Sequence, residues 1–209
     1  MVRTGWATLA ITALTAASAR AQEPPRGNVT IGSPSFIIAR YASVSASSLY
    51  AGYSLGAAGV LVAMVNNPRS GYRELVVGAM SRVAQGAQGA SFAVAIADAT
   101  DATYLQLYLV PGMALGRFTL SSTIELYEPV ARGGTRELDA NPVTARFQLN
   151  SWLGVGAAYA LALPAVGETH ERIGPTFRVA VPRGALYTEV LRNLRNSAAE
   201  VRVGMDLAF

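Results

Sequence analysis

The residues best suited to chemistry surround the chain's one histidine, His170. It lies within 167–172, with Glu168 and Glu171 as acidic neighbours. A histidine flanked by carboxylates suits either general acid–base chemistry or a bound zinc ion. No serine lies close in sequence to act as a nucleophile, and a polar loop has the same composition without any metal. We therefore predict no catalytic residue, no metal site, no cofactor and no enzymatic activity.

Other acidic residues fall in polar stretches with the composition of loops: Asp98, Asp101, Glu128, Glu137 and Asp139. Such carboxylates can bind divalent cations, but we favour solvated loop charge as the simpler interpretation. The glycines of 86–89 and 154–156 do not form phosphate-binding loops, because neither a lysine nor a helix follows them.

Composition narrows the classes of function. A chain of 209 residues predicts one domain. The absence of cysteine excludes disulfides, thiolate metal sites and cysteine nucleophiles. All 17 basic residues are arginine, the formal net charge is +4, and no basic run is interleaved with aromatics, which argues against nucleic-acid binding. Only 14% of the residues are charged, whereas about a quarter is usual in soluble domains.

The first 21 residues have the parts of a secretory signal peptide. Arg3 supplies the charge, 6–17 is an apolar stretch too short to span a membrane, and Ala19-Arg20-Ala21 is a cleavage site. A buried first helix is the alternative. We predict cleavage after Ala21, a Pro- and Gly-rich periplasmic lead-in at 22–34 without regular structure, and one folded domain at 35–209.

From residue 35 onward, short segments alternate between apolar and polar side chains. In 142–150, for example, Phe147 and Leu149 share one face while Arg146 lies on the other. Repeated alternation over segments of about ten residues is typical of transmembrane β-barrels. Twelve such segments can be drawn, at 36–44, 47–56, 58–66, 73–84, 90–98, 102–110, 116–128, 142–150, 152–163, 174–182, 184–193 and 199–209.

Short and long connections alternate between these segments. Tight turns are predicted at Pro111-Gly112, Asn150-Ser151 and Pro182-Arg183-Gly184, and longer polar stretches at 66–71, 128–141 and 165–173. These suit the periplasmic turns and the outer loops of an antiparallel up-and-down barrel, whose strand number is even. Twelve strands are preferred, and eight or ten longer strands are possible. The stretch 185–195 also fits one face of a helix.

The last strand carries the one specific resemblance. One side of it is apolar and ends in an aromatic residue: Val201, Val203, Met205, Leu207 and Phe209. It resembles the closing strand of small bacterial outer-membrane β-barrels (porin-like, OmpA-like or OmpW-like), in which a terminal aromatic residue marks the chain for assembly. The resemblance implies an outer-membrane location in a Gram-negative-type bacterium. It also implies contact with the barrel assembly machinery, outer-membrane lipid and lipopolysaccharide.

Closure of such a barrel predicts which charges point inward, because an arginine facing lipid at mid-depth costs about 2–4 kcal/mol. The charged residues on the polar rows are Glu74, Arg82, Arg117, Glu125, Arg146, Arg178, Arg202 and Asp206. Five arginines against three carboxylates leave an excess of about two positive charges, which weakly favours anions. Aromatic residues near segment ends are predicted to form interfacial girdles: Tyr41, Tyr50, Tyr53, Tyr104, Tyr108, Tyr127, Tyr159 and Trp152.

Two functions follow from the strand number. A 12-stranded barrel with this interior resembles the narrow, arginine-lined channels that pass acidic sugars, with a small anionic solute as partner. An eight-stranded barrel would be filled by the same side chains and would be a passive structural barrel. Three more interpretations are compatible with the sequence: a closed barrel acting in surface adhesion, a soluble secreted β-sandwich, and an outer-membrane lipid-modifying hydrolase using His170.

Overall fold

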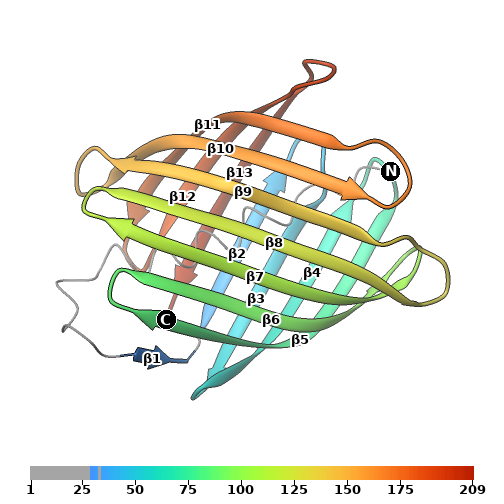
Figure 1. Ribbon diagram of the computed structural model, residues 1–209, viewed down its shortest axis with the longest axis horizontal. Coiled ribbons are helices and arrows are strands. Elements are labelled where there is room, and N and C mark those ends of the chain that lie inside the picture. Colours follow the sequence, from blue (N-terminus) through green and yellow to red (C-terminus); the bar gives the residue numbers. More distant parts are fainter. Residues whose placement is uncertain (1–28, 33) are drawn as a thin grey trace.

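A computed structural model describes residues 29–32 and 34–209, which form an all-β structure (Figure 1). Twelve antiparallel strands, β2 to β13, close into a barrel, and a short strand β1 lies at its edge. The strands are β1 Val29–Ile31, β2 Phe36–Ala42, β3 Ser47–Leu55, β4 Ala58–Asn67, β5 Tyr72–Gln85, β6 Gln88–Ala99, β7 Thr103–Leu115, β8 Phe118–Ala131, β9 Glu137–Gln148, β10 Leu153–Pro164, β11 His170–Val181, β12 Gly184–Asn193 and β13 Ala199–Ala208.

The ring closes where the last strand meets the first strand of the barrel. β13 pairs with β2 from Arg202 opposite Ala42 to Ala208 opposite Phe36, and every other neighbour in the ring is also its neighbour in the chain. This topology confirms the predicted up-and-down barrel with 12 strands. The soluble β-sandwich is therefore wrong, because two packed open sheets would leave edges that this ring does not have.

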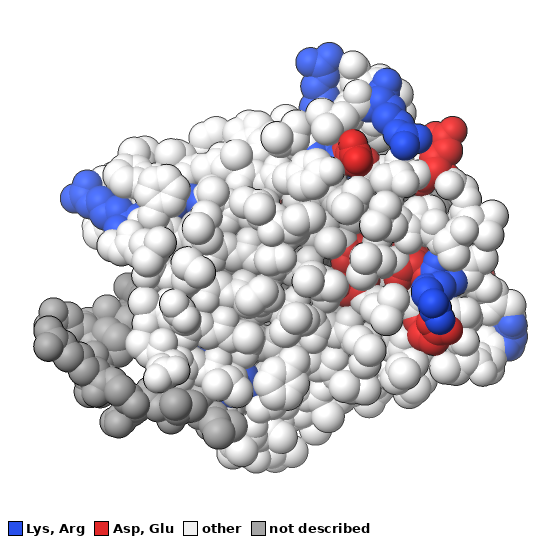
Figure 2. All heavy atoms as spheres, viewed as in Figure 1, with Lys and Arg blue, Asp and Glu red and all other residues white. Residues whose placement is uncertain are grey.

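Side chains alternate between an inner and an outer row. In β4 the inner residues Leu61, Ala63 and Val65 are at most 5% exposed, whereas Val62 is 40% and Met64 is 62% exposed. Figure 2 shows a wall almost free of charged atoms between its two ends, with most charge near one end. An apolar exterior around a closed ring is what a lipid bilayer requires of a β structure, since every backbone group must pair within the protein.

No helix among the described residues is long and apolar enough to cross a membrane. The stretch 185–195, which also fitted a helix, forms β12 and the start of the following turn.

One predicted turn was wrong. Pro111 and Gly112 lie inside β7, and the chain reverses at Gly116-Arg117, where Gly116 has a φ of 61°. The strand continues past Pro111 because β6 pairs with residues 111–113 and β8 pairs again from Gly112 onward. A glycine then provides the left-handed backbone that the two-residue hairpin needs.

The outer connections are shorter than predicted. β9 begins at Glu137 and β11 at His170, so 137–141 and 170–173 belong to strands, and only 132–136 and 165–169 connect them. These strand ends were not predicted, because they contain polar residues. The inner side of a barrel accepts polar side chains, so such a strand end has the same composition as a loop.

The predicted signal peptide and its cleavage site lie outside the described residues. The lead-in at 22–34 was predicted to lack regular structure, but Val29–Ile31 forms β1, which pairs with Val83–Gln85 of β5. β5 extends beyond its pairing with β4, which ends at Ser81, so its free backbone edge is available to this short strand.

Candidate functional site

Five buried arginines line one half of the barrel interior. They lie on β2, β9, β11 and β13, within the contiguous half of the ring that runs from β9 through β13 to β2. We call them the arginine wall: Arg40, Arg146, Arg172, Arg178 and Arg202. Each stands on the inner row of its strand, because its nearest neighbours along the strand are more exposed than it is.

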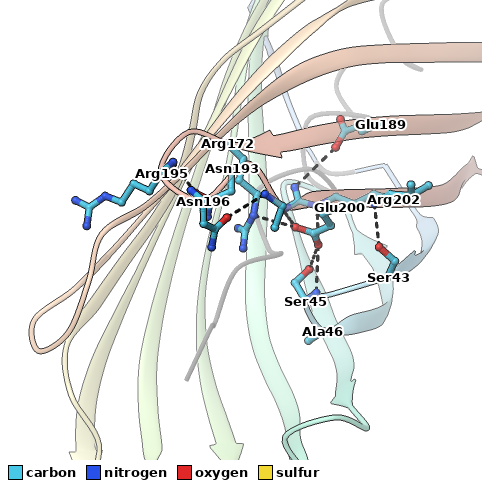
Figure 3. A network of polar contacts seen from close by, with 12 residues as sticks. Ser43, Ser45, Ala46, Arg172, Glu189, Asn193, Arg195, Asn196, Glu200 and Arg202 are labelled. Atoms are coloured by element: carbon cyan, nitrogen blue, oxygen red, sulfur yellow. Dashed lines mark hydrogen bonds and ion pairs between the residues drawn. The ribbon is translucent and has the colours of Figure 1, made fainter.

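Glu200 anchors the outer end of the arginine wall (Figure 3). Its carboxylate oxygens lie 3.3 Å from Nε of Arg172 and 3.2 Å from Nε of Arg202. The loop between β2 and β3 reaches the same carboxylate through Ser45, whose backbone N–H donates at 3.3 Å and whose hydroxyl also donates. One buried carboxylate thus joins two arginines and a loop.

A second carboxylate, Glu189 on β12, lies between two members of the wall. Its oxygens are 3.9 Å from Nη2 of Arg146 and 3.8 Å from Nη1 of Arg202. The register places Arg146, Gly156, Thr176, Glu189 and Arg202 in one row across five neighbouring strands. Because Gly156 has no side chain, Arg146 passes over β10 and donates to Thr176 Oγ1 at 3.4 Å.

The opposite half of the interior contains buried tyrosines and, among the described residues, no fully buried arginine. Tyr72 OH and Gln106 Nε2 both donate to the Glu74 carboxylate, and Tyr108 OH donates to Gln106 Oε1. The rings of Tyr104 and Tyr127 pack edge to face with centroids 5.9 Å apart. We call this group the tyrosine wall; it lies on β3, β5, β7 and β8 and comprises Tyr50, Tyr72, Tyr104, Tyr108, Tyr127, Glu74, Gln106 and Glu125.

The tyrosine wall corrects the predicted aromatic girdles. Tyr41, Tyr53 and Trp152 are more than half exposed, as girdle residues would be. Tyr50, Tyr104, Tyr108 and Tyr127 are instead buried in the interior. The prediction used only the position of these residues near segment ends, whereas period-two alternation places Tyr104 and Tyr108 on the same row as Gln106 and therefore inside the barrel.

Six of the eight charged residues predicted to point inward are buried on inner rows: Glu74, Glu125, Arg146, Arg178, Arg202 and Asp206. Arg82 is half-buried on the inner row of β5, towards the end that carries the short turns. Arg117 was misplaced by the prediction, because it lies in the exposed β7–β8 turn that the shifted hairpin creates. Whether this set lines a transport path stays a prediction.

Sequence reasoning missed six buried charges: Arg40, Glu137, Asp139, Arg172, Glu189 and Glu200. Glu137, Asp139 and Arg172 were predicted to lie in outer loops, and Glu189 fell in the stretch whose structure was ambiguous. Among the described residues, the buried charges therefore number five arginines and seven carboxylates. The buried carboxylates therefore outnumber the buried arginines by two, and the predicted excess of two positive charges was wrong. The arginines are instead segregated onto one half of the ring.

The outer rim carries exposed ion pairs. His170 begins β11, and no hydrogen bond joins it to a serine within the described part of the chain. Nor do residues 29–32 and 34–209 hold three or more potential ligands close enough for a metal ion. In the β8–β9 loop, Arg136 Nε donates to Glu128 at 2.5 Å, and this hydrogen bond raises the pKa of Arg136.

The terminal strand presents its apolar row outward. Val201, Val203 and Met205 are between 36% and 47% exposed, and Phe209 is 67% exposed. The backbone N–H of Phe209 donates to Ser35 O at 3.0 Å, which holds the chain end against the start of the barrel. The proposed role of this row in assembly stays a prediction.

No protein-family model matches this sequence, and no curated protein matches it. Solved structures do match its fold. A KdgM porin in complex with disordered oligogalacturonate superposes with a TM-score of 0.60 at 10% identity, covering 85% of this chain and 99% of the porin. A NanC porin superposes with a TM-score of 0.56 at 10% identity, covering 84% of this chain and 98% of the porin. This likeness shows that the chain shares the β-barrel fold of these porins, and its closed ring with an apolar exterior suits a membrane-spanning barrel.

Proposed function

We propose that this barrel is a narrow outer-membrane channel in which the arginine wall favours small anionic solutes. The observation that carries the proposal is the segregation of the five buried arginines onto one half of the ring, whereas Arg82 on the other half is only half-buried. Five buried carboxylates share that half, so its five arginines balance them, whereas the other half holds two buried carboxylates, Glu74 and Glu125, and no buried arginine among the described residues. A solute carrying a carboxylate would be drawn to this side, because a row of guanidinium groups at close range favours anions.

The tyrosine wall could bind the hydroxyl-bearing side of such a solute, opposite its carboxylate. Its hydroxyl, amide and carboxylate groups offer donors and acceptors that pair with sugar hydroxyls. The KdgM porin of the same fold was solved with oligogalacturonate, an acidic sugar polymer. We infer that short acidic sugars are the class of solute to test first.

The test is single-channel conductance of the refolded protein in a planar bilayer under a salt gradient. We expect discrete steps and a reversal potential on the anion-selective side for the natural sequence. Arg178→Glu should move the reversal potential towards cation selectivity, because Arg178 is buried on the inner row. Arg117→Glu is the matched control, with the same change of charge in an exposed turn, and should leave selectivity nearly unchanged.

Two results would contradict the proposal. Stable insertion without conductance steps would indicate a passive barrel, in which the inner charges only pair with one another. Equal effects of Arg178→Glu and Arg117→Glu would show that the arginine wall does not determine which ions pass.

A further inference from the structure

The outer surface of the barrel carries a long lipid-facing groove that the channel proposal does not use. The groove has a volume of about 1240 Å³. The edge of the groove nearer the short turns is a row of directly paired residues, one from each of seven neighbouring strands. In order they are Leu186, Met205, Ala39, Leu49, Met64, Leu75 and Asp98. The first six are apolar, and the small side chain of Ala39 deepens the middle of the groove.

This apolar row runs obliquely along the barrel wall, from the end with the short turns towards the end with the longer connections. Leu186 is the third residue of β12, near the short turns, whereas Asp98 is the second-last residue of β6, at the end with the longer outer connections. Because strands in such barrels tilt by about 35–45°, a row perpendicular to the strands runs obliquely from the bilayer interior to the outer rim. The row is accessible: Leu49, Met64 and Leu75 are 48%, 62% and 50% exposed.

The upper edge of the groove, towards the outer end of β3–β5, is polar. Ser47 pairs with Asn66, Asn66 with Arg73, and the backbone of Arg73 bonds Thr100. These residues line the same groove as the apolar row. An apolar row directly below a polar row marks the boundary between hydrocarbon and headgroups.

The polar edge is positively charged. Arg132 also lines the groove; its Nη2 donates to Thr103 Oγ1 at 3.0 Å and pairs with Asp98. The guanidinium group of Arg73 makes no hydrogen bond or ion pair with any described residue, and the residue is exposed. With Asp98 neutralising one of these two arginines, one unpaired guanidinium group remains directly above the apolar row.

We propose that this groove binds a phosphorylated glycolipid of the outer leaflet, a lipopolysaccharide, with acyl chains along the apolar row and a phosphate on Arg73. A guanidinium group binds phosphate through two parallel hydrogen bonds, which fits the unpaired Arg73 beside the Asp98–Arg132 pair. A second copy of the chain is less suitable as the occupant, because its exposed rim carboxylates Asp98, Glu128 and Glu168 already pair with arginines of their own chain. The proposal does not depend on whether the interior conducts.

The experiment measures binding of fluorescent lipopolysaccharide, and of the same lipid after chemical dephosphorylation, to the refolded protein in detergent. Dephosphorylation and Arg73→Gln should each weaken binding about fivefold, the size expected for an exposed charge-assisted contact. Arg73→Gln combined with Arg132→Gln should weaken it about tenfold or more, with a reduced dependence on salt. Arg195→Gln is the matched control: Arg195 is an exposed rim arginine of the β12–β13 connection, outside the groove, and its loss should leave affinity unchanged.

A photoreactive residue in place of Met64 locates the acyl chains. It should cross-link lipopolysaccharide several-fold more than one in place of Phe177, which is exposed on the outer row of β11 but outside the groove. The proposal is wrong if Arg73→Gln binds both lipids as the natural sequence does. Cross-linking of residue 64 to a second copy of the protein would instead identify the groove as a subunit interface. The folded state of each variant is checked by its mobility in unheated gels, and the single Arg73→Gln change suffices if the double variant does not refold.

Discussion

The two halves of the barrel interior stabilise their buried polar side chains by different interactions. Both must satisfy polar side chains that have been removed from bulk water. The arginine wall does so with ion pairs in which carboxylates bridge cations, as Glu200 does between Arg172 and Arg202. The tyrosine wall does so with a chain of hydrogen bonds from neutral donors, as Tyr72 and Gln106 supply to Glu74.

This difference predicts which half of the interior tolerates amino-acid substitution with less loss of stability. In an ion-pair network, loss of one carboxylate leaves buried cations facing one another, which costs more than the pair itself contributes. In a chain of neutral donors, loss of one group leaves a single unmet hydrogen bond. Stability should therefore depend more steeply on the arginine wall, while substitutions in the tyrosine wall should be comparatively mild.

Glu200→Gln should produce the largest effect. It removes the negative charge that separates Arg172 and Arg202 and weakens the acceptor for Ser45. We expect the free energy of unfolding to fall by about 3–5 kcal/mol, as when one partner of a buried ion pair is removed. Urea unfolding of the barrel in lipid vesicles, followed by tryptophan fluorescence, measures this change.

The control for this prediction is Glu168→Gln. Glu168 is 78% exposed and lies 3.9 Å from Arg195, so its loss should change the free energy of unfolding by less than about 1 kcal/mol. Equal losses for Glu200→Gln and Glu168→Gln would show that the arginine wall remains well hydrated and that its ion pairs add little.

Glu74→Gln tests the other half with the same chemical change. It accepts hydrogen bonds from Tyr72 and Gln106, which are neutral, and a glutamine oxygen can still accept from one of them. We expect a loss of about 1–2 kcal/mol in the same unfolding assay. A loss as large as that of Glu200→Gln would abolish the contrast between the two walls.

The strands were predictable from sequence because their signal is local. In β4 and β12, inner and outer residues alternate with period two, and this repeat alone places most strand bounds within a few residues. Boundaries failed where inner residues have the composition of a loop. Glu137 and Asp139 lie at the start of β9 but were predicted to be solvated loop residues. Pro111 lies within β7 but was predicted to be part of a turn.

The two walls were not predictable in the same way. Arg146, Glu189 and Arg202 meet because the successive pairings from β9 through β10, β11 and β12 to β13 align them in one row. That alignment depends on the register around the whole ring. Period two assigns a residue to a row, but it contains no information about which strand lies opposite across the interior. Arg40 was overlooked for a simpler reason, since both rows of β2 are largely apolar.

Tyr108→Phe is the mildest change that still separates the two walls. It removes the hydroxyl that donates to Gln106 and also contacts Tyr50 and Glu125, but it leaves the ring in place. We expect the free energy of unfolding to fall by about 1 kcal/mol. Tyr53→Phe, on the outer row and 64% exposed, is the matched control and should have no measurable effect. If both changes are silent, the hydrogen-bond chain of the tyrosine wall is interchangeable with water, and the wall contributes packing and surface chemistry but not stability.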